Sequence, residues 1–161
     1  MPTLDISLSV DQLAKRMQDR LRGLNAAAPN TILWQQKSDR VLIFVDSLRI
    51  RLLPGWLLCN LDLQSDETGR QTLQFIYFVG ADGNGDGVRA GSTVNASTPQ
   101  ASRLAEVWGV PLQRVLWDAV LDALEVFVTQ AATQNPGKQV SILGFHAVAD
   151  AFAAVIAAED K

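Results

Sequence analysis

Cysteine and histidine are almost missing from this chain of 161 residues. Cys59 is the single cysteine, so no disulfide can form within the chain, and a reducing cytoplasm is the expected compartment. His146 is the single histidine, which excludes a metal site built from several histidines. No apolar run approaches the roughly 18 residues that a membrane-spanning helix needs. Residues 1–5 place no basic segment before an apolar core, so we expect no signal peptide.

Positive charge is also scarce. The net charge is -3, and no cluster of lysine and arginine stands out, which argues against a nucleic-acid partner. The charge is uneven along the chain. Residues 1–51 hold eight basic and five acidic side chains, whereas residues 104–161 hold three and seven.

Apolar residues, by contrast, are abundant. They make up 48% of the chain, and the mean hydropathy is +0.10. This surplus is high for a small soluble monomer, so part of the apolar surface is expected to meet a partner, most simply a second copy of the chain. The length suits a single domain, which we expect to span residues 1–161.

The periodicity changes twice along the chain. Ser9 followed by Gln12 is typical of a capping box, and it predicts a helix up to about residue 24. Alternation with short turns then predicts strands over residues 32–37, 40–46, 48–53, 56–64 and 71–79, with a short strand near 92–96. Three further helices are expected, from residue 98 to a break at Gly109 and Pro111, from 112 to 134, and over 145–159, with an edge strand over 140–143 before the last. The expected fold class is therefore α+β, an antiparallel meander of about five to six strands that follows one helix and is covered by C-terminal helices.

A tight turn at Pro54-Gly55 would fix how two of these strands pair. Leu52 would lie opposite Leu57, and Arg49 opposite Asn60. One face of the sheet is then apolar. The other is polar in its middle and apolar at its ends, where Trp56, Leu58, Ile76 and Phe78 fall. We expect this half-polar face to be a candidate groove or interface, and the alternative is an ordinary solvated face; its polar residues are Arg49, Asn60, Asp62 and Gln74.

The helix over 112–134 has apolar residues on two of its sides. The second side is a candidate dimer interface, formed by Trp117, Leu121, Leu124 and Val128. The polar stripe contains Asp118, Asp122 and Glu125, one turn apart, which could hold a divalent metal. A solvated stripe, with Arg114 beside Asp118, is the favoured interpretation.

A calcium loop is the one metal motif with the right spacing. Asp82, Asn84 and Asp86 place oxygen ligands at alternate positions, and Gly87 stands sixth. Thr93 occupies the twelfth position, where a bidentate glutamate belongs, and Arg89 would place a cation beside the site. The alternative is a glycine-rich connection, so no cofactor is expected, and calcium would bind weakly at most.

A catalytic set is incomplete in this sequence. On a helix, His146 and Asp150 would share a face, as a base and its orienting carboxylate do. A nucleophile to complete them is missing, since Cys59 falls on the apolar face of its strand, where a buried, inert thiol is expected. The leading hypothesis is a non-catalytic cytoplasmic domain that binds a protein partner and forms a homodimer. The alternatives are a carrier of an apolar small molecule or lipid, with a pocket between sheet and long helix, and an enzyme that uses His146 and Asp150.

Overall fold

The computed structural model describes residues 3–25, 30–79 and 92–160. The elements in these residues follow the order β1 (Thr3–Ser9), α1 (Val10–Arg22), β2 (Thr31–Gln36), β3 (Asp39–Leu53), β4 (Trp56–Ser65), β5 (Gly69–Phe78), β6 (Ser92–Ala96), α2 (Pro99–Gln134), β7 (Lys138–Val148) and β8 (Ala151–Asp160).

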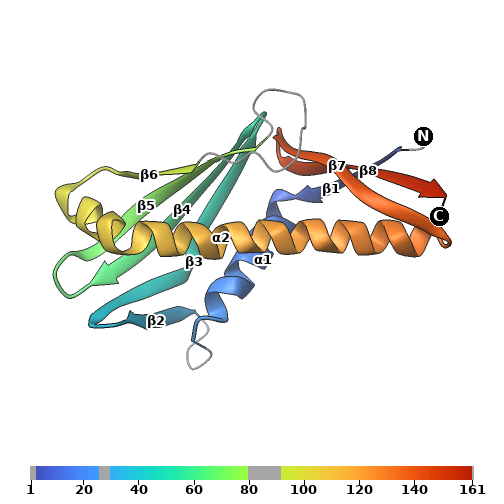
Figure 1. Ribbon diagram of the computed structural model, residues 1–161. Coiled ribbons are helices and arrows are strands. Elements are labelled where there is room, and N and C mark those ends of the chain that lie inside the picture. Colours follow the sequence, from blue (N-terminus) through green and yellow to red (C-terminus); the bar gives the residue numbers. More distant parts are fainter. Residues whose placement is uncertain (1–2, 26–29, 80–91, 161) are drawn as a thin grey trace.

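The strands described here form two antiparallel sheets. The main sheet has the order β2-β3-β4-β5-β6, and the small sheet has the order β1-β8-β7. Helix α2 runs the length of the molecule and lies against both sheets, with α1 beside its middle (Figure 1). The predicted α+β class and antiparallel meander are confirmed. Within the described residues, however, there are two helices. The predicted strand over 140–143 is part of β7, and the end of β7 with β8 stands where we predicted a helix.

The turn between β3 and β4 sets the register of the main sheet. Gly55 adopts a φ of 81°, a left-handed conformation that glycine reaches without a steric penalty. The turn pairs Leu52 with Leu57 and Arg49 with Asn60, as predicted. The buried face of β4 carries Leu57, Cys59, Leu61 and Leu63, all fully buried.

Strand β3 is one continuous strand, where the sequence predicts two. The ladder to β4 is interrupted between Phe44 and Arg49. Ser47 secures this irregularity, because its hydroxyl donates to the Phe44 carbonyl at 2.6 Å and accepts from the Asp62 amide at 2.8 Å. The side chain supplies hydrogen bonds that the ladder loses at a bulge, so the strand bends without ending.

Helix α1 begins as its capping box predicts. The Gln12 amide donates to the Ser9 hydroxyl at 3.2 Å, and the Ser9 amide donates to the Gln12 side chain at 3.0 Å. Leu13, Met17 and Leu21 then bury one helical stripe against the main sheet, where the Met17 and Cys59 sulfur atoms lie 3.8 Å apart.

The predicted break in α2 is wrong. A single helix spans 36 residues and contains Pro111, although proline removes one helical hydrogen bond and crowds the preceding turn. Trp108 and Leu112 are buried on either side of this point, and Gly109 is buried beside Val94 of β6. Buried contacts before and after Pro111 therefore keep the helix continuous across the proline. Its start is as expected, because Thr98 caps it through the Ala101 amide at 3.0 Å.

The predicted helix over 145–159 is also wrong, because these residues belong to the hairpin of β7 and β8. Alanines here suit a helix by intrinsic propensity, but burial follows a period of two, with Phe152, Ala154 and Ile156 inside. Phe152 contacts Phe145 across the hairpin, with ring centroids 5.4 Å apart. Tertiary packing thus outweighs local preference. Strand β1, not anticipated either, pairs along β8 and completes the small sheet.

Candidate functional site

The two faces of the main sheet have different environments. The inner face packs on both helices, and Tyr77 Oη there donates to the Gln113 carbonyl of α2 at 2.8 Å. The outer face is covered by neither α1 nor α2, and its side chains keep partial or full exposure along β3, β4 and β5. This outer face is where the predicted binding residues lie, and we treat it as the candidate functional site.

A row of polar side chains crosses the outer face. Arg49 pairs with Asn60, Asn60 with Gln74, and Gln74 with Asn95, so the four residues follow one line across β3, β4, β5 and β6. We call this line the polar row. Asn95 Nδ2 donates to Gln74 Oε1 at 3.4 Å. Three of the four predicted binding residues are thereby neighbours on one surface.

Asp62, the fourth predicted residue, lies in the next row and is already engaged. Its carboxylate accepts from Arg70 Nε at 3.0 Å and from the Thr72 hydroxyl at 2.6 Å. The Arg70 guanidinium also lies 3.9 Å from the centre of the Phe44 ring, a cation–π contact. Arg70 and Thr72 therefore hold the Asp62 carboxylate in place on the outer face.

An open hollow of about 670 Å³ lies beside these side chains. Part of its wall is the irregularity of β3, which tilts the strand around Asp46 and Ser47. The wall is polar and charged; it is lined by Asn30, Thr31, Phe44, Asp46, Ser47, Arg49, Asn60, Asp62, Arg70 and Thr72. Such a lining suits hydrogen-bonded, solvated ligand groups better than an apolar ligand.

The opposite end of the outer face is apolar. Trp56 and Phe78 face each other across β4 and β5, and their ring centroids are 4.1 Å apart. Leu58 and Ile76 form the adjacent pair. Trp56 remains 38% exposed, which is high for an aromatic side chain in a sheet. We call Trp56, Leu58, Ile76 and Phe78 the aromatic end.

Sequence reasoning missed several residues of this surface. Asn95 was not assigned, because the register of a five-residue strand after residues 80–91 gives no pattern to follow. Arg70 was placed in a loop, although it pairs with Gln64 inside the β4–β5 ladder. The alternation of β5 could have been extended backwards to Arg70, and that was the available signal.

The predicted dimer interface on α2 has mixed surroundings. Trp117 stacks on Tyr77 with ring centroids 5.5 Å apart and lies 6.2 Å from Phe145, so it bridges the two sheets. Leu124 is buried, Val128 is half-buried, and Leu121 is 39% exposed. Of these four side chains, Leu121 is the most exposed.

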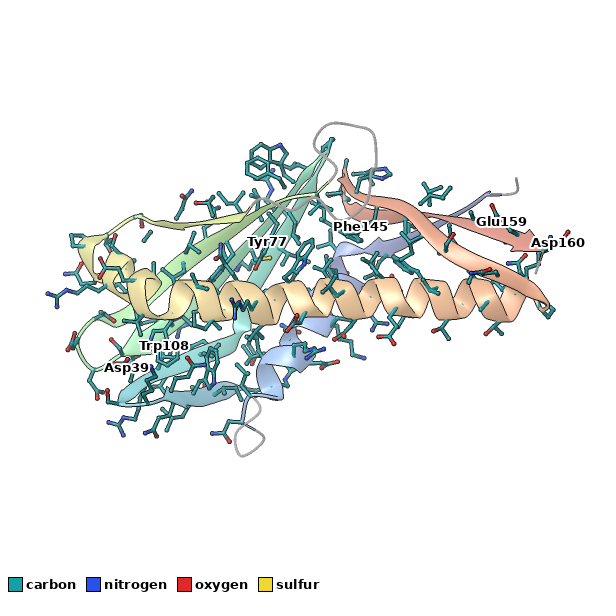
Figure 2. All side chains as sticks on the ribbon, in the orientation of Figure 1. Asp39, Tyr77, Trp108, Phe145, Glu159 and Asp160 are labelled. Atoms are coloured by element: carbon teal, nitrogen blue, oxygen red, sulfur yellow. The ribbon has the colours of Figure 1, made fainter. Side chains whose placement is uncertain are left out.

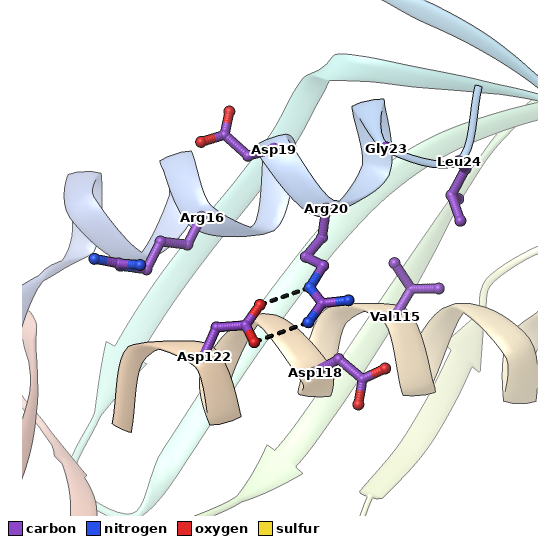
Figure 3. Close-up of a pocket in the computed structure, with 8 residues that line it drawn as sticks. All are labelled: Arg16, Asp19, Arg20, Gly23, Leu24, Val115, Asp118 and Asp122. Atoms are coloured by element: carbon purple, nitrogen blue, oxygen red, sulfur yellow. Dashed lines mark hydrogen bonds and ion pairs between the residues drawn. The ribbon is translucent and has the colours of Figure 1, made fainter. Parts of the chain in front are cut away.

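Figure 3 shows two residues of the acidic stripe of α2, Asp118 and Asp122, beside α1. Arg20 donates to Asp122 through Nε at 2.6 Å and Nη2 at 2.8 Å, a bidentate pair. The hydrogen bond from Arg20 lowers the pKa of Asp122, and the same bond raises the pKa of Arg20. A cleft of about 460 Å³ lies around this pair, lined also by Arg16 and Asp118. Among the described residues, no group of three potential metal ligands occurs.

The remaining predicted sites are placed as follows. Asp82, Asn84 and Asp86 lie outside the described residues. His146 lies in β7 and Asp150 in the following turn, so the helical spacing predicted for them is wrong. Among the residues that the structure describes, none forms a hydrogen bond with the buried Nδ1 of His146. Cys59 is buried as predicted, and burial raises the pKa of its thiol far above the usual range.

Searches of protein-family models, curated proteins and solved structures found no match for this chain. In the part of the chain that the structure describes, no helix is both long and apolar enough to cross a membrane. The function therefore has to be argued from the surface itself.

Proposed function

We propose that this protein is a non-catalytic domain that binds a protein partner on the outer face of its main sheet. One observation carries the proposal. The aromatic end and the polar row lie side by side on a sheet face that neither α1 nor α2 covers, with Leu58 opposite Arg51 and next to the Asn60 row. Protein interfaces commonly join aromatic anchors to polar groups in this way.

The groups with catalytic chemistry support the same proposal. Cys59 is buried with a raised pKa, and the carboxylate of Asp62 is bound by Arg70 and Thr72. Because His146 belongs to a strand and Asp150 to a turn, the pair lacks the geometry on which the enzyme hypothesis rested. A single buried thiol also suits a reducing compartment, so we place the domain in the cytoplasm.

The carrier hypothesis has less support. A carrier would need space between the main sheet and α2, but the side chains there are fully buried and closely packed, among them Phe75, Leu112 and Leu116. The described hollow on the outer face is polar, which does not suit a lipid.

Selection of peptides from a displayed library against the immobilised protein tests the proposal. We expect the enriched peptides to bind the Trp56→Ser and Asn60→Lys variants at least tenfold more weakly than wild type. The first substitution changes the aromatic end and the second changes the polar row. Leu143→Ser is the matched control, since Leu143 is also an exposed apolar residue, at 47%, but lies on β7. Enriched peptides that bind all three variants equally would assign the binding surface elsewhere.

We further propose that the domain forms a homodimer, for which the exposed Leu121 and the apolar surplus are the support. Sedimentation equilibrium at micromolar concentration should give twice the chain mass. Leu121→Glu should shift the association toward monomer. A strict monomer at all concentrations would refute this part and leave the outer-face proposal in place.

A further inference from the structure

The charge of the outer face differs from the charge of the chain. The chain carries a net charge of -3, yet four arginines occupy outward positions of the main sheet, at Arg40, Arg49, Arg51 and Arg70. The carboxylates on the same side belong to Asp46 and Asp62. A positive surface on an acidic protein calls for a partner that neutralises it.

Most of these charges already have partners. Asp62 binds Arg70 at 3.0 Å, Asp46 lies 3.7 Å from Arg22, and Arg40 lies 3.4 Å from Asp66. Arg49 and Arg51 differ, because neither forms an ion pair with any residue that the structure describes. Both are exposed, and both lie on the same side of β3, two residues apart.

The position of the two arginines relates them to the rest of the site. Arg49 belongs to the polar row through Asn60, and Arg51 lies opposite Leu58 of the aromatic end. A segment lying across this face would therefore meet apolar side chains and two guanidinium groups that form no ion pair within the described residues, all in neighbouring rows. Guanidinium groups bind carboxylates with two parallel hydrogen bonds, which gives direction as well as attraction.

We infer that the outer face binds an acidic polypeptide segment that carries a large apolar side chain among its carboxylates. This inference rests on the proposed function and adds the chemistry of the partner. The apolar side chain would contact Trp56 and Leu58, while carboxylates on either side would reach Arg49 and Arg51. A nucleic acid would need a wider basic surface than Arg49 and Arg51 provide on an acidic chain.

Three synthetic peptides labelled with fluorescein test the inference by fluorescence anisotropy. In all three peptides, apolar residues (Leu and Phe in turn) alternate with polar residues. The polar residue is Glu in the first peptide, Gln in the second and Lys in the third. We expect the Glu peptide to bind about tenfold tighter than the Gln peptide, and the Lys peptide to bind most weakly. Raising the salt concentration should reduce the advantage of the Glu peptide, because exposed ion pairs are screened.

Variants locate the effect on the surface. In the double variant Arg49→Gln/Arg51→Gln, the Glu peptide should fall to the affinity of the Gln peptide. Trp56→Ser should weaken both peptides. Arg114→Gln is the matched control, because it removes an exposed arginine from α2, away from the outer face, and should change nothing.

Each other outcome is decisive. Equal binding of the Glu and Gln peptides, both sensitive to Trp56→Ser, would overturn the acidic partner and leave the proposed function standing. Glu-peptide binding that survives the double variant, or no binding of any peptide at millimolar concentration, would also overturn it. So would tighter binding of oligothymidylate, or loss of a homodimer in the double variant, which would assign the face to nucleic acid or to a second copy.

Discussion

At the scale of single residues, the pair of Arg20 and Asp122 ties α1 to α2. Its geometry is bidentate, but both side chains are well exposed, at 46% and 38%. Water and salt screen such a pair, so its contribution to the free energy of unfolding should be below about 1 kcal/mol. The pair therefore orients two helices that are already held by buried side chains such as Leu13, Leu21 and Leu116.

The same pair makes stability depend on pH. Asp122 has a lowered pKa in the folded protein, so folding favours its ionised form, and the stabilisation is complete above the ordinary aspartate pKa near 4. It is lost as pH falls through the lowered value. We expect Asp122→Asn to reduce the free energy of unfolding at pH 7, and the difference from wild type to vanish at strongly acidic pH. Urea denaturation at a series of pH values measures it.

Asp118→Asn is the control for this prediction. Asp118 lines the same cleft but accepts no hydrogen bond from Arg20. Asp118→Asn should therefore lower the free energy of unfolding at pH 7 by less than Asp122→Asn does. In a double-mutant cycle, Arg20→Gln should add little to Asp122→Asn. Fully additive effects of the two substitutions would show that the pair does not act as a unit.

Residue-scale prediction succeeded where local chemistry decides the structure. Pro54-Gly55 fixes one turn, so the neighbours Arg49 and Asn60 followed from the sequence. The hydrogen-bond partners of Asp62 could not be predicted in this way. Arg70 and Thr72 lie beside Asp62 only because of the register between β4 and β5. The capping of α1 by Ser9 was predictable for the same reason as the turn, since donor and acceptor are three residues apart.

At the scale of elements, α2 shows how packing can outweigh a helix-breaking residue. Pro111 leaves the Val107 carbonyl without its helical donor, yet the helix continues. We expect Pro111→Ala to raise the free energy of unfolding by about 1 kcal/mol, because it restores a hydrogen bond while giving back some freedom to the unfolded chain. Urea denaturation measures the change, with Arg114→Ala as an exposed control in the same helix. A loss of stability would mean that α2 needs a bend at Pro111 to reach both sheets.

The hairpin of β7 and β8 depends on its turn. Asp150 has a φ of 63°, a left-handed conformation that aspartate tolerates and β-branched residues do not. We expect Asp150→Val to lower the free energy of unfolding by about 1–2 kcal/mol. Asp150→Gly should leave the free energy of unfolding unchanged or raise it. Both variants keep the amide that donates to the Leu52 carbonyl at 3.1 Å. If Gly and Val cost the same in urea denaturation, the Asp150 side chain, rather than its backbone conformation, would hold the turn.

The same hairpin shows where element prediction fails. An alanine-rich segment with apolar residues at mixed spacings fits a helix and a strand about equally well, so its neighbours decide. Here β7 supplies one neighbour through a tight hairpin, and β1 supplies the other from the opposite end of the chain. The main sheet was predictable because its strands alternate strictly and are joined by short turns.

At the scale of the whole molecule, backbone hydrogen bonds join the two sheets. The Gly55 amide donates to the Ala147 carbonyl at 2.9 Å, and the Ala147 amide donates to the Val79 carbonyl at 3.2 Å. Trp117 of α2 fills the same junction, in contact with Tyr77 of the main sheet and Phe145 of the small sheet; the latter two are labelled in Figure 2. Backbone and side-chain contacts thus connect the sheets directly, in addition to the helix that both share.

This junction predicts that the two sheets unfold together as one domain. Amide hydrogen exchange should give the same free energy of opening, within about 1 kcal/mol, for the slowest amides of β4 and β8, such as Leu61 and Ile156. Trp117→Ala should lower both values by about 2–4 kcal/mol, because it removes a large side chain from the packed junction. Trp56→Ala is the matched control, since it removes an exposed tryptophan from the outer face and should leave both values nearly unchanged. If β8 opened at a much lower free energy than β4, the small sheet would be a separate unit, and the outer face of the main sheet would keep its shape without it.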